Sequence, residues 1–412
     1  MIRLSAPTHT IKAKIYLGGS KSINNRLLIL NELFQLNSDL QNLSSSEDTF
    51  LLQKALAQLK NSKQASIHIG HAGSDLRFLT ALLAITEGVW DLTGSDRLKE
   101  RPIAELVRAL RELGADIAYL EKENFPPLKI KGKKLKGGTL EIDSSISSQF
   151  VSALLLIAPA LENGLSLNLK NSPVSRPYID MTLALLTGLG VQVEASAQSI
   201  RVEPAGVLIK TKSFIESDWS SASYWYSMCA LAPHSEIELF YLNKSSLQAD
   251  AIIVDLYKTL GVETLYKENS VLIRHIPLQA TSFDYDFTNC PDIAQSIAPL
   301  CFALGIPARL HGLKTLRLKE SDRIEALKTE LEKLGASIKV EKDSLYISGN
   351  LDKTIIPQPI ATYNDHRMAL AFAPLALLLK ELRIQHPSVI DKSYPGFWED
   401  LKSVGFNVNL QP

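Results

Sequence analysis

The chain has 412 residues, which is too long for one ordinary domain and predicts two. Lys and Arg together number 44, as do Asp and Glu, so the formal net charge is zero and no overall field attracts nucleic acid or an anionic membrane. The longest apolar run, residues 368–379, contains a proline and is too short to cross a bilayer. Three scattered cysteines without metal-ligand spacing, and a start without a signal-peptide pattern, predict a cytoplasmic protein.

The first predicted helix, residues 27–36, follows a strand at 11–17 and a turn rich in glycine and serine. Backbone N–H groups at a helix N-terminus point outward, so such a turn is a candidate anion site. Lys21 lies in this turn and Arg26 at its end, and both add positive charge. The spacing excludes a Walker A loop, and an ordinary serine cap with exposed cations remains the alternative.

Two more turns of this kind follow. Gly73 precedes an apolar helix at 76–85, and a residue without Cβ lets a ligand approach the backbone closely. Arg101 ends a turn with three cations before a helix at 103–113. Taken alone, each is also consistent with a solvated turn.

Four serines in residues 144–148 precede an apolar helix at 150–161. This is more than one cap requires, and a phosphate bound at the helix N-terminus would explain them. Ser175 and Tyr178 belong to a similar but weaker turn, which is equally consistent with an ordinary loop.

In the second half, Asp292 precedes a helix at 293–304, where an N-cap aspartate is expected anyway. Lys319, Glu320 and Arg323 precede a helix at 324–334, and helix spacing predicts that the two cations share a face. Two cations with a carboxylate between them suit a small, multiply anionic substrate that needs a proton moved. The alternative is a solvated capping segment with paired charges.

A repeat organises these turns. Five segments share a leucine-rich helix, a glycine turn and an alternating strand, at Gly114, Gly190, Gly261, Gly335 and Gly405, with a sixth, degenerate copy at 59–69. The spacing of about 70 residues exceeds a solenoid turn and predicts six units in two pseudo-symmetric domains. Cations in pre-helix turns of both halves, with Arg367 and Lys392 among them, would then converge on one cleft, where Glu320 and Asp292 supply proton transfer.

Six motifs resemble, in order and spacing, the 5-enolpyruvylshikimate-3-phosphate synthase family: residues 20–22 with Arg26, 99–103, 147–150, 177–180, 319–323 and 363–368. The resemblance covers essentially the whole chain. It implies an α/β (α+β) fold of two domains, each of three βαβαββ units, with the active site in the cleft between them. The first domain would span residues 15–215, and the second residues 1–14 with 216–412.

The resemblance also implies the reaction and its residues. The carboxyvinyl group of phosphoenolpyruvate would pass to the 5-hydroxyl of shikimate 3-phosphate, without metal ion or organic cofactor. Asp292 would accept the hydroxyl proton and Glu320 would protonate the methylene, with Lys21 as a third catalytic residue. The implied ligands of shikimate 3-phosphate are Lys21, Ser22, Arg26, Ser147, Ser148, Gln149, Ser175, Tyr178, Asp292, Thr315 and Lys319. Those of phosphoenolpyruvate are Lys21, Gly73, Arg101, Gln149, Arg323, Arg367 and Lys392.

The chain departs from the family pattern at His71, Ser74, Asp75 and Phe78, close to the predicted phosphoenolpyruvate site, and Thr315 replaces an asparagine. Two alternatives stay open. UDP-N-acetylglucosamine enolpyruvyl transferase has the same architecture but carries a cysteine on the loop that here spans residues 96–102. A non-catalytic anion-binding protein would not need both acids. We expect a monomer whose partners are the two small molecules.

Overall fold

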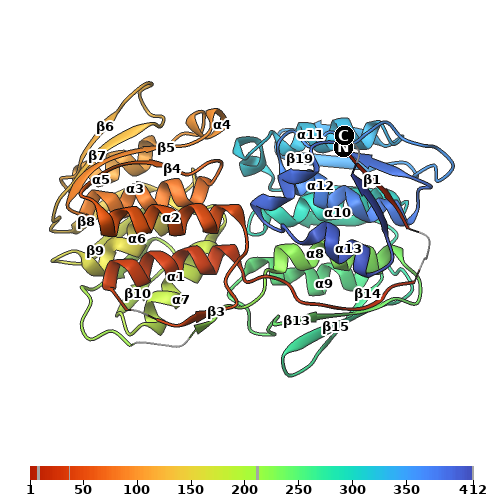
Figure 1. Ribbon diagram of the computed structural model, residues 1–412, viewed down its shortest axis with the longest axis horizontal. Coiled ribbons are helices and arrows are strands. Elements are labelled where there is room, and N and C mark those ends of the chain that lie inside the picture. The colour runs from red at the N-terminus through yellow and green to blue at the C-terminus, as the bar shows by residue number, and fades with distance from the viewer. Residues whose placement is uncertain (7–9, 37, 210–212, 411–412) are drawn as a thin grey trace. The chain divides into compact units, whose positions relative to one another are not determined.

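The computed structural model describes residues 1–6, 10–36, 38–209 and 213–410 (Figure 1). Its contacts divide the chain into two units, one of Lys21–Ile215 and the other of Met1–Ser20 together with Glu216–Pro412. The boundary expected after residue 14 would cut strand β2 (Lys12–Ile15), which pairs in parallel with β13 (Glu236–Phe240) of the second unit. The division therefore lies after Ser20.

The unit of residues 21–215 contains two four-stranded sheets of one topology. The first has the order β4-β5-β7-β6, with β4 (Gln64–His68), β5 (Gly88–Thr93), β6 (Asp116–Tyr119) and β7 (Leu128–Gly132). The second has the order β10-β11-β9-β8, with β8 (Gly138–Asp143), β9 (Leu165–Lys170), β10 (Val193–Ala195) and β11 (Ser199–Val202). In each sheet, the two strands that come first in the chain are parallel neighbours, β4 with β5 and β8 with β9. The two that come last in the chain form an antiparallel hairpin, β6 with β7 and β10 with β11.

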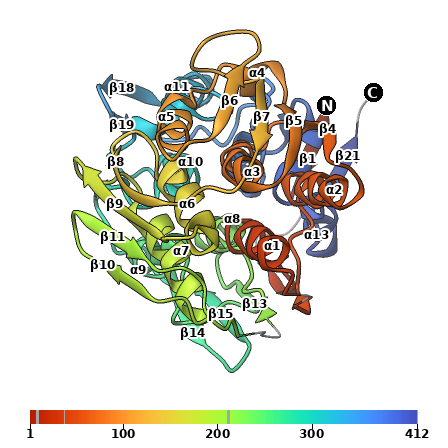
Figure 2. The same cartoon turned by 90° about the vertical axis from the view of Figure 1, so that its left-hand side faces the viewer.

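Helices connect these strands in βαβαββ order. They are α3 (Gly73–Ile85), α4 (Asp96–Lys99) and α5 (Ala104–Glu112) in the first repeat, and α6 (Ser148–Ile157), the 3-10 helix η1 (Ala158–Ala160) and α7 (Arg176–Gly188) in the second. Figure 2, which views this unit end on, shows α3 and α6 inside the strands. Both helices are buried on nearly all sides, as their position requires.

A third repeat is reduced to α1 (Lys21–Phe34), α2 (Glu47–Asn61) and two short parallel strands, β3 (Leu40–Gln41) and β12 (Ser213–Phe214). At the degenerate copy expected at residues 59–69, a strand follows the end of α2, as the sequence predicts. The strand that follows α2 is β4, which opens the next sheet as a parallel neighbour of β5 and is not part of a hairpin.

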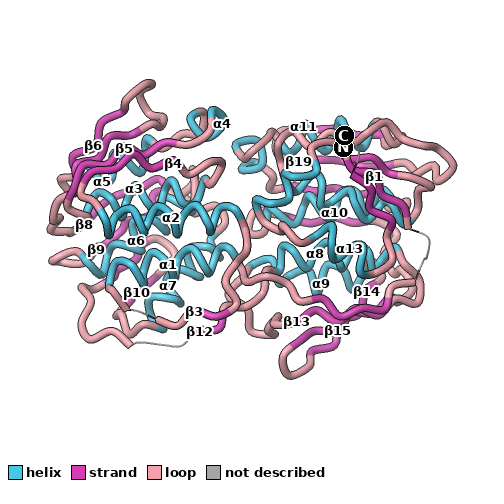
Figure 3. The backbone as a smooth tube through the Cα atoms, viewed as in Figure 1, coloured by secondary structure: helices cyan, strands magenta, loops and turns pink. Residues whose placement is uncertain are grey.

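The other unit contains two further four-stranded sheets and one of three strands (Figure 3). The first, β14-β15-β13-β2, includes β14 (Val262–Tyr266) and β15 (Ser270–His275), with helices α8 (Trp219–Leu231), η2 (Ala249–Ile252) and α9 (Ile253–Thr259). The second, β16-β17-β19-β18, has β16 (Phe283–Asp286), β17 (Ala308–His311), β18 (Ser337–Glu341) and β19 (Ser344–Ser348), with η3 (Pro291–Ile293), α10 (Ala294–Ala303), η4 (Lys314–Leu318) and α11 (Arg323–Glu332). The third, β20-β1-β21, has β1 (Ile2–Ser5), β20 (Leu382–Ile384) and β21 (Asn407–Leu410), with α12 (His366–Phe372), η5 (Ala373–Leu377), η6 (Pro387–Lys392) and α13 (Phe397–Ser403).

The repeated glycines end helices as the sequence predicts. Gly114, Gly190, Gly261, Gly335 and Gly405 have φ of +98°, +87°, +97°, +94° and +95°. This left-handed conformation is costly for a residue with a Cβ, so glycine closes each helix and directs the chain into the following strand. The strands that follow are β6, β10, β14, β18 and β21.

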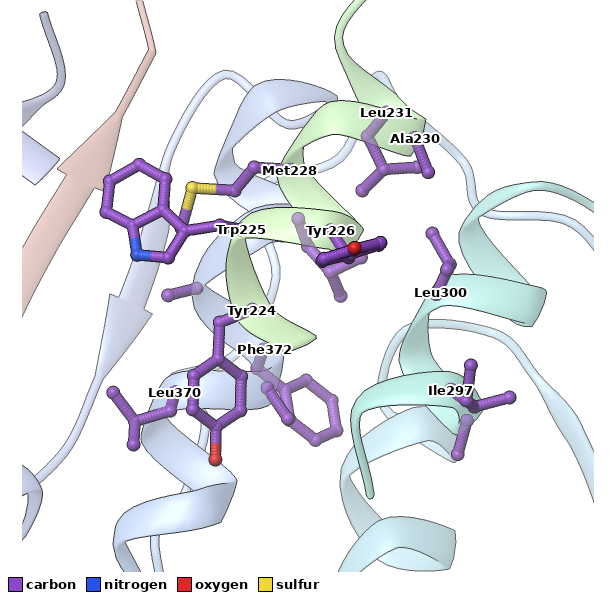
Figure 4. Packing of buried hydrophobic residues seen from close by; sticks show 14 of the residues in the cluster. Tyr224, Trp225, Tyr226, Met228, Ala230, Leu231, Ile297, Leu300, Leu370 and Phe372 are labelled. Atoms are coloured by element: carbon purple, nitrogen blue, oxygen red, sulfur yellow. The ribbon is translucent and has the colours of Figure 1, made fainter. Parts of the chain in front are cut away.

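The core of the second unit forms around α8, whose Tyr224, Trp225 and Tyr226 are almost fully buried. Figure 4 shows Tyr224 near Leu370 and Phe372 of α12, with Ile297 and Leu300 of α10 on the other side of α8 from Trp225. Close packing of large rings fixes the three helices against one another. The polar first turns of α8 and α12, and the η3 turn before α10, are thereby held in place.

Candidate active site

In the unit of residues 21–215, helix α1 begins at Lys21, earlier than the sequence predicts. Lys21 and Ser22 therefore lie in its first turn and Arg26 lies inside the helix. The Lys21 ammonium donates to Asp48 Oδ2 at 2.8 Å, and the Asp48 side chain is only 8% exposed. This ion pair fixes the direction of a cation at a helix N-terminus.

Arg26 is buried without a carboxylate partner among the described residues. Its guanidinium donates to Thr182 Oγ1 at 2.8 Å and to the Ser22 carbonyl at 2.8 Å, and it lies over the ring of Phe78 at 5.1 Å. Burial lowers the pKa of Arg26 to about 10, so the group is still charged at neutral pH. A buried cation balanced only by neutral oxygens and a ring favours a bound anion.

Only part of the serine cluster is available for an anion. Ser144 Oγ donates to the carbonyls of Lys170 and Asn171, and Ser145 Oγ donates to Asp143. These two serines therefore hold the loop, and the expectation that a phosphate explains all four is wrong.

Ser147 is the N-cap of α6, where its Oγ accepts from Gln149 N, and Ser148 is buried in the first turn. Gln149 Nε2 donates to Ser74 Oγ at 3.0 Å, which connects this turn to the start of α3. Ser175 has a φ of +53° directly before α7, and Tyr178 lies in the first turn of that helix. The turns of this unit that the sequence indicates as candidate anion sites thus include the starts of α1, α3, α6 and α7.

Gly73 and Arg101 lie against each other. An added Cβ at Gly73 would be 2.0 Å from Arg101 Nη1, and Arg101 is 8% exposed. Arg77, which sequence reasoning missed, clamps this corner by donating to the Gly73 and Pro102 carbonyls. The feature of the sequence that could have identified Arg77 is its position one helical turn after Gly73.

The departures from the family pattern at Asp75 and Phe78 are both buried. Asp75 accepts from Asn25 Nδ2 at 2.7 Å, which links α3 to α1. The ring of Phe78 packs against the guanidinium of Arg26. His71 Nδ1 lies 2.7 Å from Ser95 Oγ at the start of α4, away from these contacts.

The other unit contains a compact ion network centred on Arg323, which is 1% exposed. Its guanidinium reaches Asp292 Oδ1 at 2.7 Å, Glu320 Oε2 at 2.9 Å and Asp365 Oδ2 at 2.7 Å. Lys319 lies before helix α11 and not on its face, so the shared-face prediction is wrong, although its Nζ is 3.7 Å from the same Asp292 oxygen.

Two more cations complete this network. Arg367 Nη2 donates to Asp292 Oδ2 at 3.0 Å, and Lys392 Nζ donates to Glu320 Oε1 at 2.5 Å. Four cations (Lys319, Arg323, Arg367 and Lys392) thus face three carboxylates (Asp292, Glu320 and Asp365). Asp250 and Asp218 also act on Arg367, so an anionic ligand would compete with carboxyl groups for these cations.

Burial opposes the ionisation of Asp292, yet Arg367, Lys319 and Arg323 together hold its pKa well below the ordinary range. The carboxylate is therefore charged but weakly basic while all three cations point at it. Any ligand that draws cations away from Asp292 makes it a stronger base.

Sequence reasoning missed one acid of this network, Asp365. Asp365 is the N-cap of α12, since it accepts from Arg367 N, and it also forms the ion pair with Arg323. Tyr363 and Asn364 before it have φ of +53° and +55°. Two left-handed non-glycine residues at a helix start are strained, which is common at functional turns. Thr315 takes no part in these ion pairs, and its Oγ1 is buried without a hydrogen-bond partner among the described residues.

Among the described residues, no group of three or more His, Cys, Asp or Glu side chains is arranged to hold a metal ion. In the same part of the chain, no helix is both long enough and apolar enough to cross a membrane.

Comparisons with known proteins agree over nearly the whole chain. A family model described as EPSP synthase (3-phosphoshikimate 1-carboxyvinyltransferase) matches residues 6–401. The 3-phosphoshikimate 1-carboxyvinyltransferase of Bacteroides fragilis (strain YCH46) is 44% identical, over 99% of this chain and 98% of that protein. The enzyme of the same name from Photobacterium damsela subsp. piscicida is 37% identical, over 97% and 98%.

Solved structures show the same fold. An EPSP synthase from Acinetobacter baumannii superimposes with a TM-score of 0.77 at 20% identity, over 99% of this chain and 100% of that chain. The enolpyruvyl transferase NikO from Streptomyces tendae gives a TM-score of 0.74 at 15% identity, over 99% and 98%.

Proposed function

The chain belongs to the EPSP synthase family, and we propose that it carries out the reaction of that family with the two groups of residues described above. It transfers the enolpyruvyl group of phosphoenolpyruvate to shikimate 3-phosphate, a step of the shikimate pathway toward aromatic amino acids. The observation that carries the assignment of residues is the network in which Arg323 holds Asp292 and Glu320 together, because it places two acids among cations that anionic substrates also require.

We assign shikimate 3-phosphate chiefly to the unit of residues 21–215. The starts of α6 and α7 offer hydroxyls and backbone N–H groups for the phosphate, and Arg26 offers a buried charge without a carboxylate partner among the described residues. The proposed ligands there are Lys21, Ser22, Arg26, Ser147, Ser148, Gln149, Ser175 and Tyr178. Asp292, Thr315 and Lys319 of the other unit would complete the set.

Phosphoenolpyruvate carries both a phosphate and a carboxylate, so it requires several fixed cations. Arg101 beside Gly73 supplies one, and the Arg323 network supplies Arg367 and Lys392 as further donors. We propose that Arg323, Lys21 and Gln149 also contact this substrate.

The proton transfers follow from the charges. As the anionic substrates draw Arg367 and Lys319 away from Asp292, this carboxylate gains basicity and accepts the proton of the 5-hydroxyl. As phosphoenolpyruvate draws Lys392 and Arg323 away from Glu320, this carboxylate takes up a proton from solvent and passes it to the methylene carbon, while the hydroxyl oxygen bonds to the neighbouring carbon. Glu320 then takes a proton back from the methyl group as the bond between carbon and the phosphate oxygen breaks, which restores the double bond, and the proton held by Asp292 passes to the departing phosphate. Lys21 stabilises the charge that develops.

We further propose that the protein acts as a cytoplasmic monomer on these two small molecules, without metal ion or organic cofactor. The balanced charge supports the absence of a nucleic-acid or membrane partner.

A coupled assay of phosphate release tests the function. With phosphoenolpyruvate and shikimate 3-phosphate, we expect one phosphate and one enolpyruvyl product per turnover, the latter identified by mass. UDP-N-acetylglucosamine as the acceptor should give no release, since residues 96–102 contain no cysteine. Binding of both substrates without phosphate release would instead indicate an anion-binding protein.

A further inference from the structure

Asp250 is a buried carboxyl that the roles proposed above do not use. It lies in η2, is 4% exposed, and its Oδ2 pairs with Ser220 Oγ in the first turn of α8. Its Oδ1 is buried and has no hydrogen-bond partner among the described residues. A buried carboxyl oxygen without a donor destabilises the fold if it is ionised, so this group is poorly explained by stability alone.

Asp250 reaches the ion network through a single hydroxyl. Ser220 Oγ accepts from Arg367 Nη2 at 3.2 Å, and the same nitrogen donates to Asp292 Oδ2 at 3.0 Å. Arg367 Nη1 donates to the Tyr224 hydroxyl at 3.3 Å. Arg367 therefore lies between two carboxyl groups, one in direct contact and one connected through Ser220.

The charged surroundings of Asp250 can be named from each element that packs around it. Asp292 comes from η3, Arg367 from α12 and Asp218 from the N-cap of α8, and the thiol of Cys290 lies next to η3. Burial, followed by the charge of Asp292, raises the pKa of Asp250 to about 7, while Arg367 and the Ser220 hydroxyl oppose the shift. Both protonation states are thus accessible near neutral pH.

We propose that Asp250 is a positioning residue that acts through Ser220 on Arg367, and that its protonation state sets how strongly Arg367 holds the anionic substrate. When the carboxyl is neutral, Arg367 shares its charge between Asp292 and the ligand alone. When the carboxyl is ionised, a second negative charge competes for the same guanidinium. This inference rests on the proposed role of Arg367 as a ligand of phosphoenolpyruvate.

The sign of the pH effect follows. Affinity for phosphoenolpyruvate should be higher below pH 7, where Asp250 is neutral, and should decrease as pH rises through 7. A partly screened charge at this distance predicts an increase in the KM for phosphoenolpyruvate of about 5- to 10-fold between pH 6 and 8. The KM for shikimate 3-phosphate, which depends mainly on the other unit, should change much less.

The test compares steady-state pH profiles of the full chain and its variants. Asp250→Asn keeps the shape of the side chain and is neutral at every pH, so its KM for phosphoenolpyruvate should lose the increase through pH 7. Ser220→Ala should reduce the increase. Asp255→Asn, which changes an exposed aspartate on the neighbouring α9, should leave the wild-type profile unchanged.

If Asp250→Asn keeps the wild-type increase in the KM for phosphoenolpyruvate with pH, the proposal is overturned. This also holds if the variant raises that KM equally at every pH, because such a result indicates a purely structural hydrogen bond. A full slope in Ser220→Ala would overturn the route through the hydroxyl. If Asp250→Asn does not fold, the wild type decides, because a flat KM through pH 7 contradicts the inference. Turnover of the wild type at pH 6 is measured in the same series, so failure of the proposed function is seen separately as absence of phosphate release.

Discussion

The variant Gly73→Ala tests whether the start of α3 and Arg101 form part of the phosphoenolpyruvate site. The added methyl group would lie 2.0 Å from Arg101 Nη1 and 2.6 Å from Cζ. Gly73 has no positive φ, so the backbone tolerates alanine and the guanidinium has to move by more than an ångström. Overpacking of this kind costs about 1–3 kcal/mol, which corresponds to roughly 5- to 150-fold in affinity.

The expected result is an increase in the KM for phosphoenolpyruvate within that range and little change in the KM for shikimate 3-phosphate. Gly188→Ala is the matched control, because a Cβ at this last residue of α7 meets nothing within 4 Å. A double-mutant cycle with Arg101→Ala sharpens the test. If the methyl group acts by moving Arg101, the two effects are not additive. Additive effects, or equal increases in both KM values, would refute the reasoning.

Three further variants probe charge and protonation. Glu320→Gln should reduce kcat by ~10²–10⁴, with calorimetric binding of shikimate 3-phosphate retained; near-normal kcat with a lowered Tm would make Glu320 structural. Arg26→Lys keeps a charge but not the geometry that reaches Thr182 Oγ1, so the KM for shikimate 3-phosphate should rise while that for phosphoenolpyruvate changes little. The raised pKa of Asp250 contributes stability at low pH that is lost as pH rises toward about 7, so the Tm of Asp250→Asn relative to wild type should increase with pH. The full difference is on the order of 4 kcal/mol, and a pH-independent Tm difference would contradict it.

The repeat was predictable because its signals are local. Each leucine-rich helix ends at a glycine in the left-handed conformation, with φ near +95° at Gly335 and Gly405. Because this conformation favours glycine, the residue type alone marks the end of the helix. The reduced third repeat was not predictable in detail. Its strands β3 and β12 pair residues 40–41 with 213–214, and no local pattern marks two-residue strands that meet across such a separation.

Several cations of the candidate site were predictable for a similar reason, since Lys21, Arg323 and Arg367 stand at a helix start, whereas Lys392 is the last residue of η6. Two of their acidic partners, Asp48 and Asp365, were not predictable. Lys21 pairs with Asp48, 27 residues away, and Arg323 with Asp365, 42 residues away. Such pairs depend on tertiary packing. An aspartate at a helix start is already explained by capping, so its sequence position gives no reason to expect an ion pair as well.

The ion network itself explains why acid–base chemistry would wait for substrate. Asp292 receives Arg323, Arg367 and Lys319 at once, so its basicity is suppressed while those cations have no other anion to bind. Each anionic substrate competes for the same cations, and every cation it takes raises the proton affinity of the carboxylate left behind. Substrate binding and the activation of Asp292 as a base then have the same electrostatic cause. A buried pair of this kind is poorly suited to stabilising the fold, but it suits a site in which the ligand replaces one of the partners.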